Sequence, residues 1–258
     1  MREIHPSAVI HPQAEIATDV AIGPYSVIGA GVQIDSSVDV GSHVVIEGPC
    51  RIGKNCRFFP FASIGQIPQD LKFHGEKSKV IIGEQNTFRE FVTIHRGTEG
   101  GGRRTVIGAN NYFMAYVHVA HDCQIGNWVI MANGATLAGH VEVNDHAVIG
   151  AFSGVHQFCR VGTHGFVGGY SVITKDVLPF SKSVGNRAHC YGINAVGLQR
   201  KGFSQEAIRT IKHAYRLLFQ SKLNTSQALE AIQKEVAHSK EVDLLIEFIR
   251  TSKRGITK

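Results

Sequence analysis

A histidine followed directly by an aspartate is the first pair in this sequence that could do chemistry. His121 and Asp122 stand in the segment HVAHDC, and a histidine whose orientation is fixed by a carboxylate can act as a general base. Gly139 and His140 follow eighteen residues later. Gly139 leaves its backbone N–H accessible, and such a donor can stabilise an oxyanion. The alternative is a surface pair of Asp122 and His140, with Gly139 only permitting a turn.

These residues belong to a repeat with a period of six. Large apolar residues occupy every sixth position from Ile4 to Ile64, and the pattern returns from Ile82 to Ile94 and from Ile107 to Ile173. An α-helix would spread such residues over its whole surface. A smaller residue stands four places after most of the large ones, which indicates short strands with alternate side chains pointing inward. Three hexads make one triangular coil of a hexapeptide β-helix.

The repeat predicts how the reactive residues are placed. Residues eighteen apart lie above one another on adjacent coils, about 4.8 Å apart. We therefore expect Gly139 beside His121 and His140 beside Asp122. Both His121 and Asp122 fall between inward positions, so both should face outward at a corner. Glycines directly after the large residue, such as Gly126, are expected to turn the corners with unusual backbone angles.

The cysteines are mostly explained by the same repeat. Four of the five occupy the small inward position and are predicted to be packing residues: Cys50, Cys56, Cys123 and Cys159. The inward phase of Cys123 argues against a thiol nucleophile beside His121. An odd number of cysteines in a chain of this length favours free thiols and a cytoplasmic location. The sequence has no signal-like start and no long apolar run, so no stable membrane insertion is expected.

The repeat is interrupted twice and then ends. Residues 65–80 and 96–105 are polar and rich in glycine, so they are predicted to be loops that project from the prism. We place the β-helix domain at residues 1–187 and a helical domain at residues 188–258. The formal charge of +6 comes entirely from the last quarter, where residues 190–258 hold 12 basic and 6 acidic residues. Such a charge can steer an acidic partner.

Three helices are predicted in the C-terminal domain. Ser204 can cap the first, which runs through EAIRTIKHAYRLLFQ with apolar residues at helical spacing. Thr225 or Ser226 opens the second, through ALEAIQKEVA, and the third is VDLLIEFIR. The predicted architecture is a β-helical prism followed by a small helical domain.

The chain resembles the UDP-N-acetylglucosamine O-acyltransferases of lipid A biosynthesis over nearly its whole length. The resemblance is carried by QDLKF (69–73), VTIHRGT (92–98), HVAHDC (118–123), LAGHV (137–141), VHQFCRVG (155–162) and RKGFSQEAI (200–208). It implies a left-handed parallel β-helix, a homotrimer, no cofactor and no nucleic-acid partner. The implied reaction transfers a 3-hydroxyacyl chain from acyl carrier protein to the 3-hydroxyl of UDP-N-acetylglucosamine, the first step of the pathway.

The resemblance also implies roles for individual residues. His121 would be the general base, oriented by Asp122, and Gly139 would lie at the oxyanion, with no covalent acyl-enzyme. Gln69, Asp70 and Lys72 would contact substrate from an adjacent subunit. The other residues with an implied substrate-binding role are His95, His118, His140, His156, Gln157, Gly169, Asn194, Arg200 and Lys201.

Two positions bear on substrate choice. Val196 stands where the family usually has a glutamate that contacts the nucleotide, so an acceptor with a 3-amino group is an alternative. Gly169 corresponds to a residue that closes the acyl groove in the family. Because glycine leaves the groove open, a long chain of the hydroxymyristoyl type is predicted.

Other functions remain open from the sequence. The later N-acyltransferase of the same pathway has a globular domain before its repeat, whereas this repeat begins at Ile4. An acetyltransferase that uses coenzyme A is a second enzyme alternative. A non-catalytic scaffold or metal-binding module is a third, with His95, His118 and His121 meeting across a subunit boundary. We expect no metal.

Overall fold

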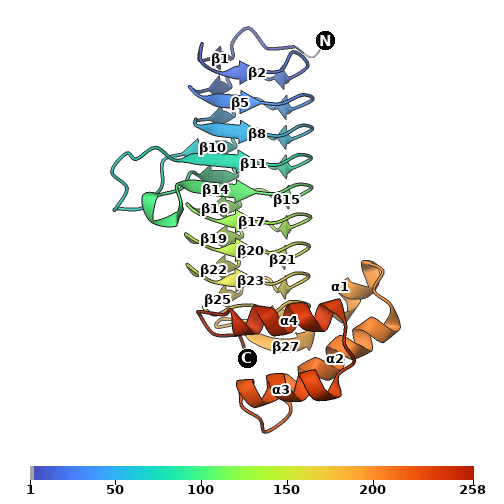
Figure 1. Cartoon of the computed structure of the whole chain (residues 1–258). Coiled ribbons are helices and arrows are strands. Elements are labelled where there is room, and N and C mark those ends of the chain that lie inside the picture. The colour runs from blue at the N-terminus through green and yellow to red at the C-terminus, as the bar shows by residue number, and fades with distance from the viewer. Residues whose placement is uncertain (1–2) are drawn as a thin grey trace.

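The computed structural model describes residues 3–258 as a tall triangular prism with helices gathered at its C-terminal end (Figure 1). Short strands form three sheets of nine, eight and ten strands, and strands from successive coils lie side by side. Val27 pairs with Val45 and Gln124 with Glu142, each eighteen residues apart. This parallel register confirms the predicted hexapeptide β-helix, and the coil is left-handed.

Each wall of the prism is one sheet. The first sheet contains β1 (Val9–Ile10), β4 (Val27–Ile28), β7 (Val45–Ile46), β10 (Ser63–Gln66), β13 (Thr93–His95), β16 (His118–Val119), β19 (Thr136–Leu137), β22 (Gly154–Val155) and β25 (Val172–Ile173). The second contains β2 (Glu15–Ile16), β5 (Val32–Ile34), β8 (Cys50–Ile52), β11 (Lys79–Ile82), β14 (Arg104–Ile107), β17 (Gln124–Ile125), β20 (Glu142–Val143) and β23 (Arg160–Val161). The third contains β3 (Ala21–Ile22), β6 (Asp39–Val40), β9 (Arg57–Phe58), β12 (Thr87–Phe88), β15 (Tyr112–Phe113), β18 (Ile130–Met131), β21 (Val148–Ile149), β24 (Phe166–Val167), β26 (Ser181–Val184) and β27 (His189–Ile193).

The interior of the prism is filled by the large and small inward residues. Phe88, Phe113 and Met131 are completely buried, and so are the small Cys56 and Cys123. Cys50 and Cys159 are buried as well, whereas Cys190 lies outside the prism core and is half-buried. The prediction that four cysteines pack inward is confirmed, so the chemistry must lie on the outer surface.

The backbone conformation at the corners differs in one respect from the sequence prediction. Glycines such as Gly53 and Gly126 do not have the unusual backbone angles that we expected, since the left-handed conformation falls two residues later. Asn55 and Trp128, which lie two residues after Gly53 and Gly126, both have φ of 58°. The glycine is needed for close approach instead: a Cβ at Gly53 would lie 2.8 Å from the carbonyl carbon of Gly83 on the next coil.

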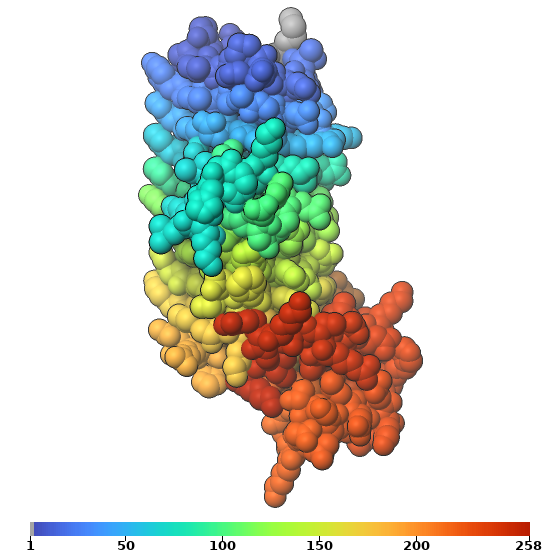
Figure 2. All heavy atoms as spheres, turned by 60° about the vertical axis from the view of Figure 1, so that its left-hand side comes forward, coloured from blue at the N-terminus to red at the C-terminus, as the bar shows by residue number. Residues whose placement is uncertain are grey.

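The two predicted loops project from one side of the prism, at the left of Figure 1. Residues 67–78 connect β10 to β11, and residues 96–103 connect β13 to β14 with a single 3-10 turn, η1 (Glu99–Gly101). Figure 2 brings this side forward and shows the loops lying over the middle of the prism. Residues 65–66 and 79–80 of the first predicted loop and residues 104–105 of the second belong to the flanking strands.

The helical part contains α1 (Ala195–Arg200), α2 (Gln205–Phe219), α3 (Thr225–Glu235) and α4 (Lys240–Arg250). Ser204 caps α2 by accepting from the backbone N–H of Ala207, as predicted. Helix α3 begins at Thr225, one of the two predicted starts, and Asn224 is its N-cap. The short α1 and the antiparallel hairpin of β26 and β27 were not predicted. The domain boundary after residue 187 stays a prediction, because this hairpin spans it.

The chain returns from α4 to the end of the prism. Arg160 binds the buried Asp176 with 3.1 Å between Nε and Oδ2, and its guanidinium lies 4.2 Å from the ring centre of Phe248. Thr257 donates its backbone N–H to the carbonyl of Asp176. These contacts join the helices to the last coils. In residues 3–258, no helix has the length and apolar character needed to cross a membrane.

Candidate active site

His121 and Asp122 form a directly hydrogen-bonded pair at the corner between the first and second sheets. The distance from His121 Nδ1 to Asp122 Oδ2 is 2.8 Å. The Asp122 side chain is completely buried, while His121 stays partly accessible. Asp122 also accepts hydrogen bonds from the backbone N–H and the hydroxyl of Thr98, the latter at 2.6 Å. The carboxylate is thus fixed on one side by Thr98 and on the other by His121.

The second loop, residues 96–103, is what buries the carboxylate. Its glycines allow the loop backbone to lie directly on Asp122: a Cβ on Gly101 would be 2.0 Å from Asp122 Cγ, and one on Gly97 would be 2.6 Å from Oδ1. Asp122 itself has φ of 61°, a conformation that aspartate tolerates better than most residues. The alternative of an exposed Asp122–His140 surface pair is therefore wrong.

The surroundings favour the ionised form of Asp122. Burial raises the pKa of its carboxyl group, but hydrogen bonds from His121 and Thr98 outweigh this effect and hold the pKa below its usual range. A carboxylate acceptor fixes the proton of neutral His121 on Nδ1. The Nε2 atom is then free to accept a proton, which is the state that a general base requires.

Gly139 lies directly beneath the imidazole of His121, as the repeat predicted. A Cβ at this position would be 2.4 Å from His121 Cε1 and 2.6 Å from Nε2, so only glycine leaves room for the ring. Within residues 3–258, the Gly139 N–H donates no hydrogen bond to the protein. An unpaired donor next to the basic nitrogen is suited to an oxyanion that develops there.

Two further histidines surround the pair. His140 lies edge-on to His121 with 5.1 Å between ring centres and stacks on Phe158 at 4.5 Å. Its Nε2 is 3.9 Å from Asp122 Oδ2. Burial lowers the pKa of His140 more than the charge of Asp122 raises it. His118, on β16, hydrogen-bonds to Thr93 at 2.7 Å, and burial and the nearby His121 lower its pKa.

His95 is the most deeply placed histidine of this group. It is buried at the end of β13, edge-on to His118 with 4.9 Å between ring centres. Burial, with smaller contributions from His118 and His121, lowers its pKa to about 4. His95 Nδ1 has no hydrogen-bond partner in the described part of the chain. His95 is therefore neutral near pH 7.

The side chains that come together as candidate metal ligands are not the set of His95, His118 and His121 that the sequence suggested. In residues 3–258, the group whose ligand atoms come together is His121, Asp122 and His140, within 4.8 Å of one another. His95, His118 and His121 do not form such a group within one chain. Asp122 Oδ2 already accepts from His121 and Thr98, so the cluster is organised by hydrogen bonds.

Hollows flank this corner on both sides. One, of about 500 Å³, has Asp70 and Lys72 of the first loop on one side and His140 and Phe158 on the other. Asp70 and Lys72 thus approach His140 of the same chain, and the expected contact from an adjacent subunit stays a prediction. Gln69 is exposed on the same loop.

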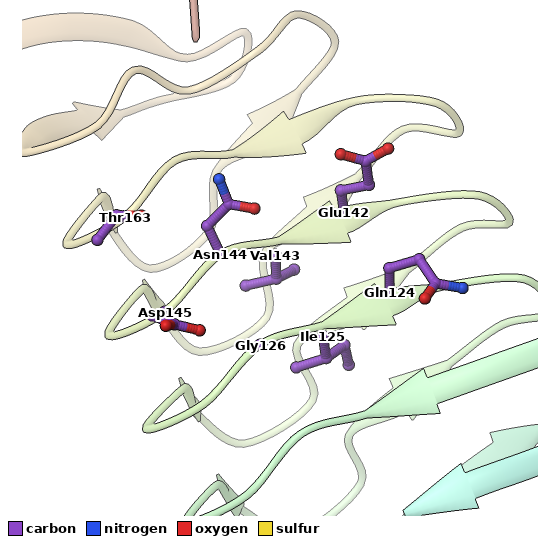
Figure 3. A pocket seen from close by; sticks show the side chains of 8 residues that line it. All are labelled: Gln124, Ile125, Gly126, Glu142, Val143, Asn144, Asp145 and Thr163. Atoms are coloured by element: carbon purple, nitrogen blue, oxygen red, sulfur yellow. The ribbon is translucent and has the colours of Figure 1, made fainter. Parts of the chain in front are cut away.

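The outer face of the second sheet is hollowed as well. Beside Asp122 and His140 lies a hollow of about 370 Å³ that includes Arg160 and Lys253. A shallow hollow of about 350 Å³ continues across the sheet, as Figure 3 shows. Gln124 and Glu142 line both, so a continuous strip connects the His121–Asp122 corner to the opposite corner of this sheet.

The remaining predicted residues lie farther along the prism. His156 and Gln157 are exposed at the same corner as His121. Gly169 is exposed at the corner between the third and first sheets, and a Cβ added there would meet only backbone atoms of Ala151 within 4 Å.

The three predicted nucleotide-binding residues lie at the start of the helical part. The side chain of Asn194 accepts a hydrogen bond from Gly197 N–H and caps α1, while Arg200 and Lys201 are exposed. The charge of Lys201 acts on His146 and His164, at the corner between the second and third sheets. In one chain, Lys201 and His121 therefore lie at different corners.

Three contributors were not singled out from the sequence. Thr98 ends the segment VTIHRGT but gave no sign that it would hold Asp122. Phe158 lies eighteen residues after His140, and this spacing could have identified it. Arg254, whose Nη2 lies 3.3 Å from His156 Nδ1, comes from the C-terminal segment, and no local pattern could have placed it there.

Comparisons with known proteins identify the family of the chain. Residues 176–257 match the family described as "Udp N-acetylglucosamine O-acyltransferase; Domain 2", and residues 104–139 match the bacterial transferase hexapeptide repeat. The chain is 51% identical to the acyl-[acyl-carrier-protein]–UDP-N-acetylglucosamine O-acyltransferase of Thermodesulfovibrio yellowstonii and 48% identical to that of Halorhodospira halophila, over 100% of each chain.

Solved structures lead to the same family. The LpxA structure from Acinetobacter baumannii superposes with a TM-score of 0.96 at 44% identity, covering 99% of both chains. The UDP-N-acetylglucosamine acyltransferase of Francisella novicida has a TM-score of 0.96 at 41% identity, covering 99% of this chain and 94% of that one. The hexapeptide prism and the full-length similarity show that this chain is an acyltransferase of the UDP-N-acetylglucosamine O-acyltransferase family.

Proposed function

We propose that the protein transfers a 3-hydroxyacyl chain from acyl carrier protein to the 3-hydroxyl of UDP-N-acetylglucosamine, the first step of lipid A biosynthesis. The printed names of the relatives identify this donor and acceptor for those proteins. The observation that carries the proposal is the buried Asp122 carboxylate bound to His121 directly above Gly139. The five free cysteines suit the reducing cytoplasm, where we place the reaction.

The geometry supports direct transfer without an acyl-enzyme. His121 Nε2 takes the proton of the sugar hydroxyl as the oxygen attacks the thioester carbonyl, and the N–H of Gly139 binds the resulting oxyanion. When the thiolate leaves, the protonated His121 returns a proton to it. The nearby Cys123 cannot act as a nucleophile, because it is buried in the core and burial raises its pKa to about 12.

The substrate contacts follow from the position of each residue. Asp70, Lys72 and His140 would hold the sugar in the hollow that they line. Gln69 and His118 would contact the sugar as well, whereas His95 is buried against His118. His156, Gln157 and the open surface at Gly169 would follow the acyl chain. Asn194, Arg200 and Lys201 would bind the nucleotide, because two neighbouring cations suit a diphosphate. The basic helical part would favour the acidic carrier protein.

A homotrimer would explain a row of exposed rings on the prism. At the corner between the third and first sheets, rings on successive coils stack about 5 Å apart, and several are roughly half exposed. We call this row the aromatic ladder: Tyr25, His43, Phe61, Phe91 and Tyr116. An extended apolar strip of this kind is typical of a subunit interface.

The test compares acyl transfer by the wild-type protein and by a His121→Ala variant. We expect the variant to lose about 10²- to 10⁴-fold in kcat while its circular dichroism and unfolding curve remain those of the wild type, because only the general base is removed. His213→Ala, on the exposed face of α2, is the matched control and should retain full activity. A His121→Ala variant with normal kcat would exclude His121 as the base.

The same assay should also test a second acceptor. Val196 is 59% exposed on α1, where the family usually has a carboxylate, so the nucleotide is held without that group. UDP-sugars with a 3-hydroxyl and with a 3-amino group should be compared at equal concentration, each with ten- and fourteen-carbon donors. Faster transfer to the 3-amino sugar would replace the proposed acceptor. A preference for the ten-carbon donor would exclude the long chain predicted from Gly169.

A further inference from the structure

His121, Asp122 and His140 bring together three atoms of the kinds that bind zinc. His121 Nδ1 lies 2.8 Å from Asp122 Oδ2, and His140 Nε2 lies 3.9 Å from the same oxygen. One nitrogen of each histidine and one carboxylate oxygen lie within 4.8 Å of one another. Zn²⁺ binds such atoms at about 2.0–2.2 Å, so its tetrahedral ligands stand about 3.3 Å apart. Small side-chain movements would therefore complete three corners of a tetrahedron.

The carboxylate at the centre of this group is already held in place by other residues. The backbone N–H of Thr98 donates to both oxygens of Asp122, and the Thr98 hydroxyl donates to Oδ2. Outer hydrogen bonds of this kind orient metal-binding side chains. The ring of His140 stacks on Phe158 with 4.5 Å between ring centres, which limits its rotation. Two of the three ligands are therefore oriented before any ion binds.

A hollow gives an ion access to the group. Asp122 and His140 both line the hollow of about 370 Å³ on the face of the second sheet. The Asp122 side chain has no exposed surface, while those of His121 and His140 are 15% and 20% exposed. The walls of the hollow have charges of both signs, with Asp122, Glu142 and Asp176 opposed by Arg160 and Lys253. A cation is therefore not excluded, and it would reach two of the three ligands directly from this hollow.

We infer that His121, Asp122 and His140 form a capture site for Zn²⁺, and that the bound ion switches the proposed base off. The ion would replace the hydrogen bond between His121 and Asp122 and bind the lone pair of His121 Nδ1. The proton that Nδ1 carried in the neutral ring then moves to Nε2, so no proton is gained or lost. A protonated Nε2 cannot accept a proton from a sugar hydroxyl. The inhibition rests on the proposed function, whereas the binding of zinc does not.

The ligand set selects zinc over the common divalent cations of the cell. Two imidazoles and one carboxylate supply two nitrogen ligands and one oxygen ligand, and they leave a fourth position open, which suits Zn²⁺. Mg²⁺ requires six oxygen ligands in an octahedron and gives up its bound water reluctantly. Ca²⁺ requires six or more oxygen ligands. Neither ion should compete with zinc at this group.

Zinc binding is measured on the full-length protein without substrates, by competition with a chromophoric chelator after EDTA treatment and desalting. His140→Phe keeps a ring that can stack on Phe158 but removes the nitrogen ligand, so it should weaken zinc binding by at least about 100-fold. His146→Phe is the matched control, because His146 occupies the same place at another corner, with φ of 60° against 62° for His140. Equal zinc affinity of His140→Phe and wild type would refute the site, and so would a loss confined to His146→Phe.

X-ray absorption at the zinc edge identifies the ligands in the wild-type protein, so this measurement does not depend on the folding of a variant. We expect nitrogen and oxygen ligands at about 2.0–2.2 Å, with the outer scattering of imidazole rings and without sulfur. A sulfur ligand at about 2.3 Å would place the ion at Cys190, the cysteine that lies outside the prism core, and would overturn the inference.

Acyl transfer by the wild-type protein tests whether bound zinc switches the base off. The zinc concentration that halves the rate should equal the dissociation constant from the chelator competition, EDTA should restore the rate, and Mg²⁺ at the same concentration should not inhibit. An unchanged rate at full zinc occupancy, or equal inhibition by Mg²⁺, would overturn the switch. If the protein without zinc transfers no acyl group to UDP-N-acetylglucosamine, the proposed function fails. The chelator competition still decides the zinc site in that case, because it requires no turnover.

Discussion

At the scale of single residues, the buried histidines decide how the protein responds to acid. His95 is buried without a partner for Nδ1, and its pKa is lowered to about 4. Between pH 6.5 and 4, the folded protein therefore binds fewer protons at this position than the unfolded chain does. The free energy of unfolding must fall as the pH is lowered through this range, while His95 contributes no pH dependence above it.

This pH effect can be measured by urea unfolding at pH values from 7 to 4. The pKa of His95 falls from 6.5 to about 4, which corresponds to a loss on the order of 3 kcal/mol between the two ends of the range. His95→Gln should remove that part of the loss, whereas His213→Gln, on the surface of α2, should not. If the free energy of unfolding falls equally with pH in His95→Gln and in the wild type, the prediction is contradicted.

At the scale of elements, the loop of residues 96–103 supports the proposed catalytic pair, His121 and Asp122. The wall strands place His121 and Asp122 at the corner, but Thr98 in the loop supplies the hydrogen bonds that fix the carboxylate. The loop can do this because Gly101 lies against Asp122 with no space for a side chain. A loop outside the prism therefore fixes Asp122, the hydrogen-bond partner of the proposed base His121.

Adding a methyl group to this loop should test its role. Gly101→Ala would place a Cβ 2.0 Å from Asp122 Cγ, so the loop or the carboxylate must move. Displacements of about 1 Å can cost up to about 10²-fold in rate, and we expect kcat to fall at least tenfold with the melting temperature little changed. Gly100→Ala, where a Cβ would have no neighbour within 4 Å, should behave as wild type. Equal rates for both variants would show that the loop is dispensable.

The sequence predicted positions best in the elements where one residue type repeats at a fixed spacing. The hexad phase placed Gly139 beneath His121 and turned Cys123 inward, because a coil of fixed length converts spacing into position. It did not predict that Thr98 buries Asp122, since a loop outside the repeat has no phase to follow. The β26–β27 hairpin was missed for a similar reason: it lies where the hexads stop and before helical spacing begins.

At the scale of the whole molecule, the aromatic ladder should hold three copies together. Phe91 lies in the middle of the ladder, 41% exposed, between Phe61 and Tyr116. Phe91→Lys would bury a charge in the proposed interface. Light scattering of the Phe91→Lys variant should then give the monomer mass of 28.1 kDa, whereas the wild type should give three times this mass. Leu244→Lys, an exposed position on α4, should leave the mass unchanged. A wild-type protein that runs as a monomer would remove the proposed trimer.

The left-handed backbone at the corners has a consequence for how the surface can change. Trp128, His140 and Phe158 all have positive φ, which costs on the order of 1 kcal/mol per residue compared with glycine or asparagine. The cost falls on the backbone, so it is nearly the same whichever ring the side chain has. The outward residue at each corner can therefore be replaced by another without altering the prism. Such residues recur about every 4.8 Å along the prism. New ligand specificities can arise along such a column one residue at a time, while the interior that determines the fold stays untouched.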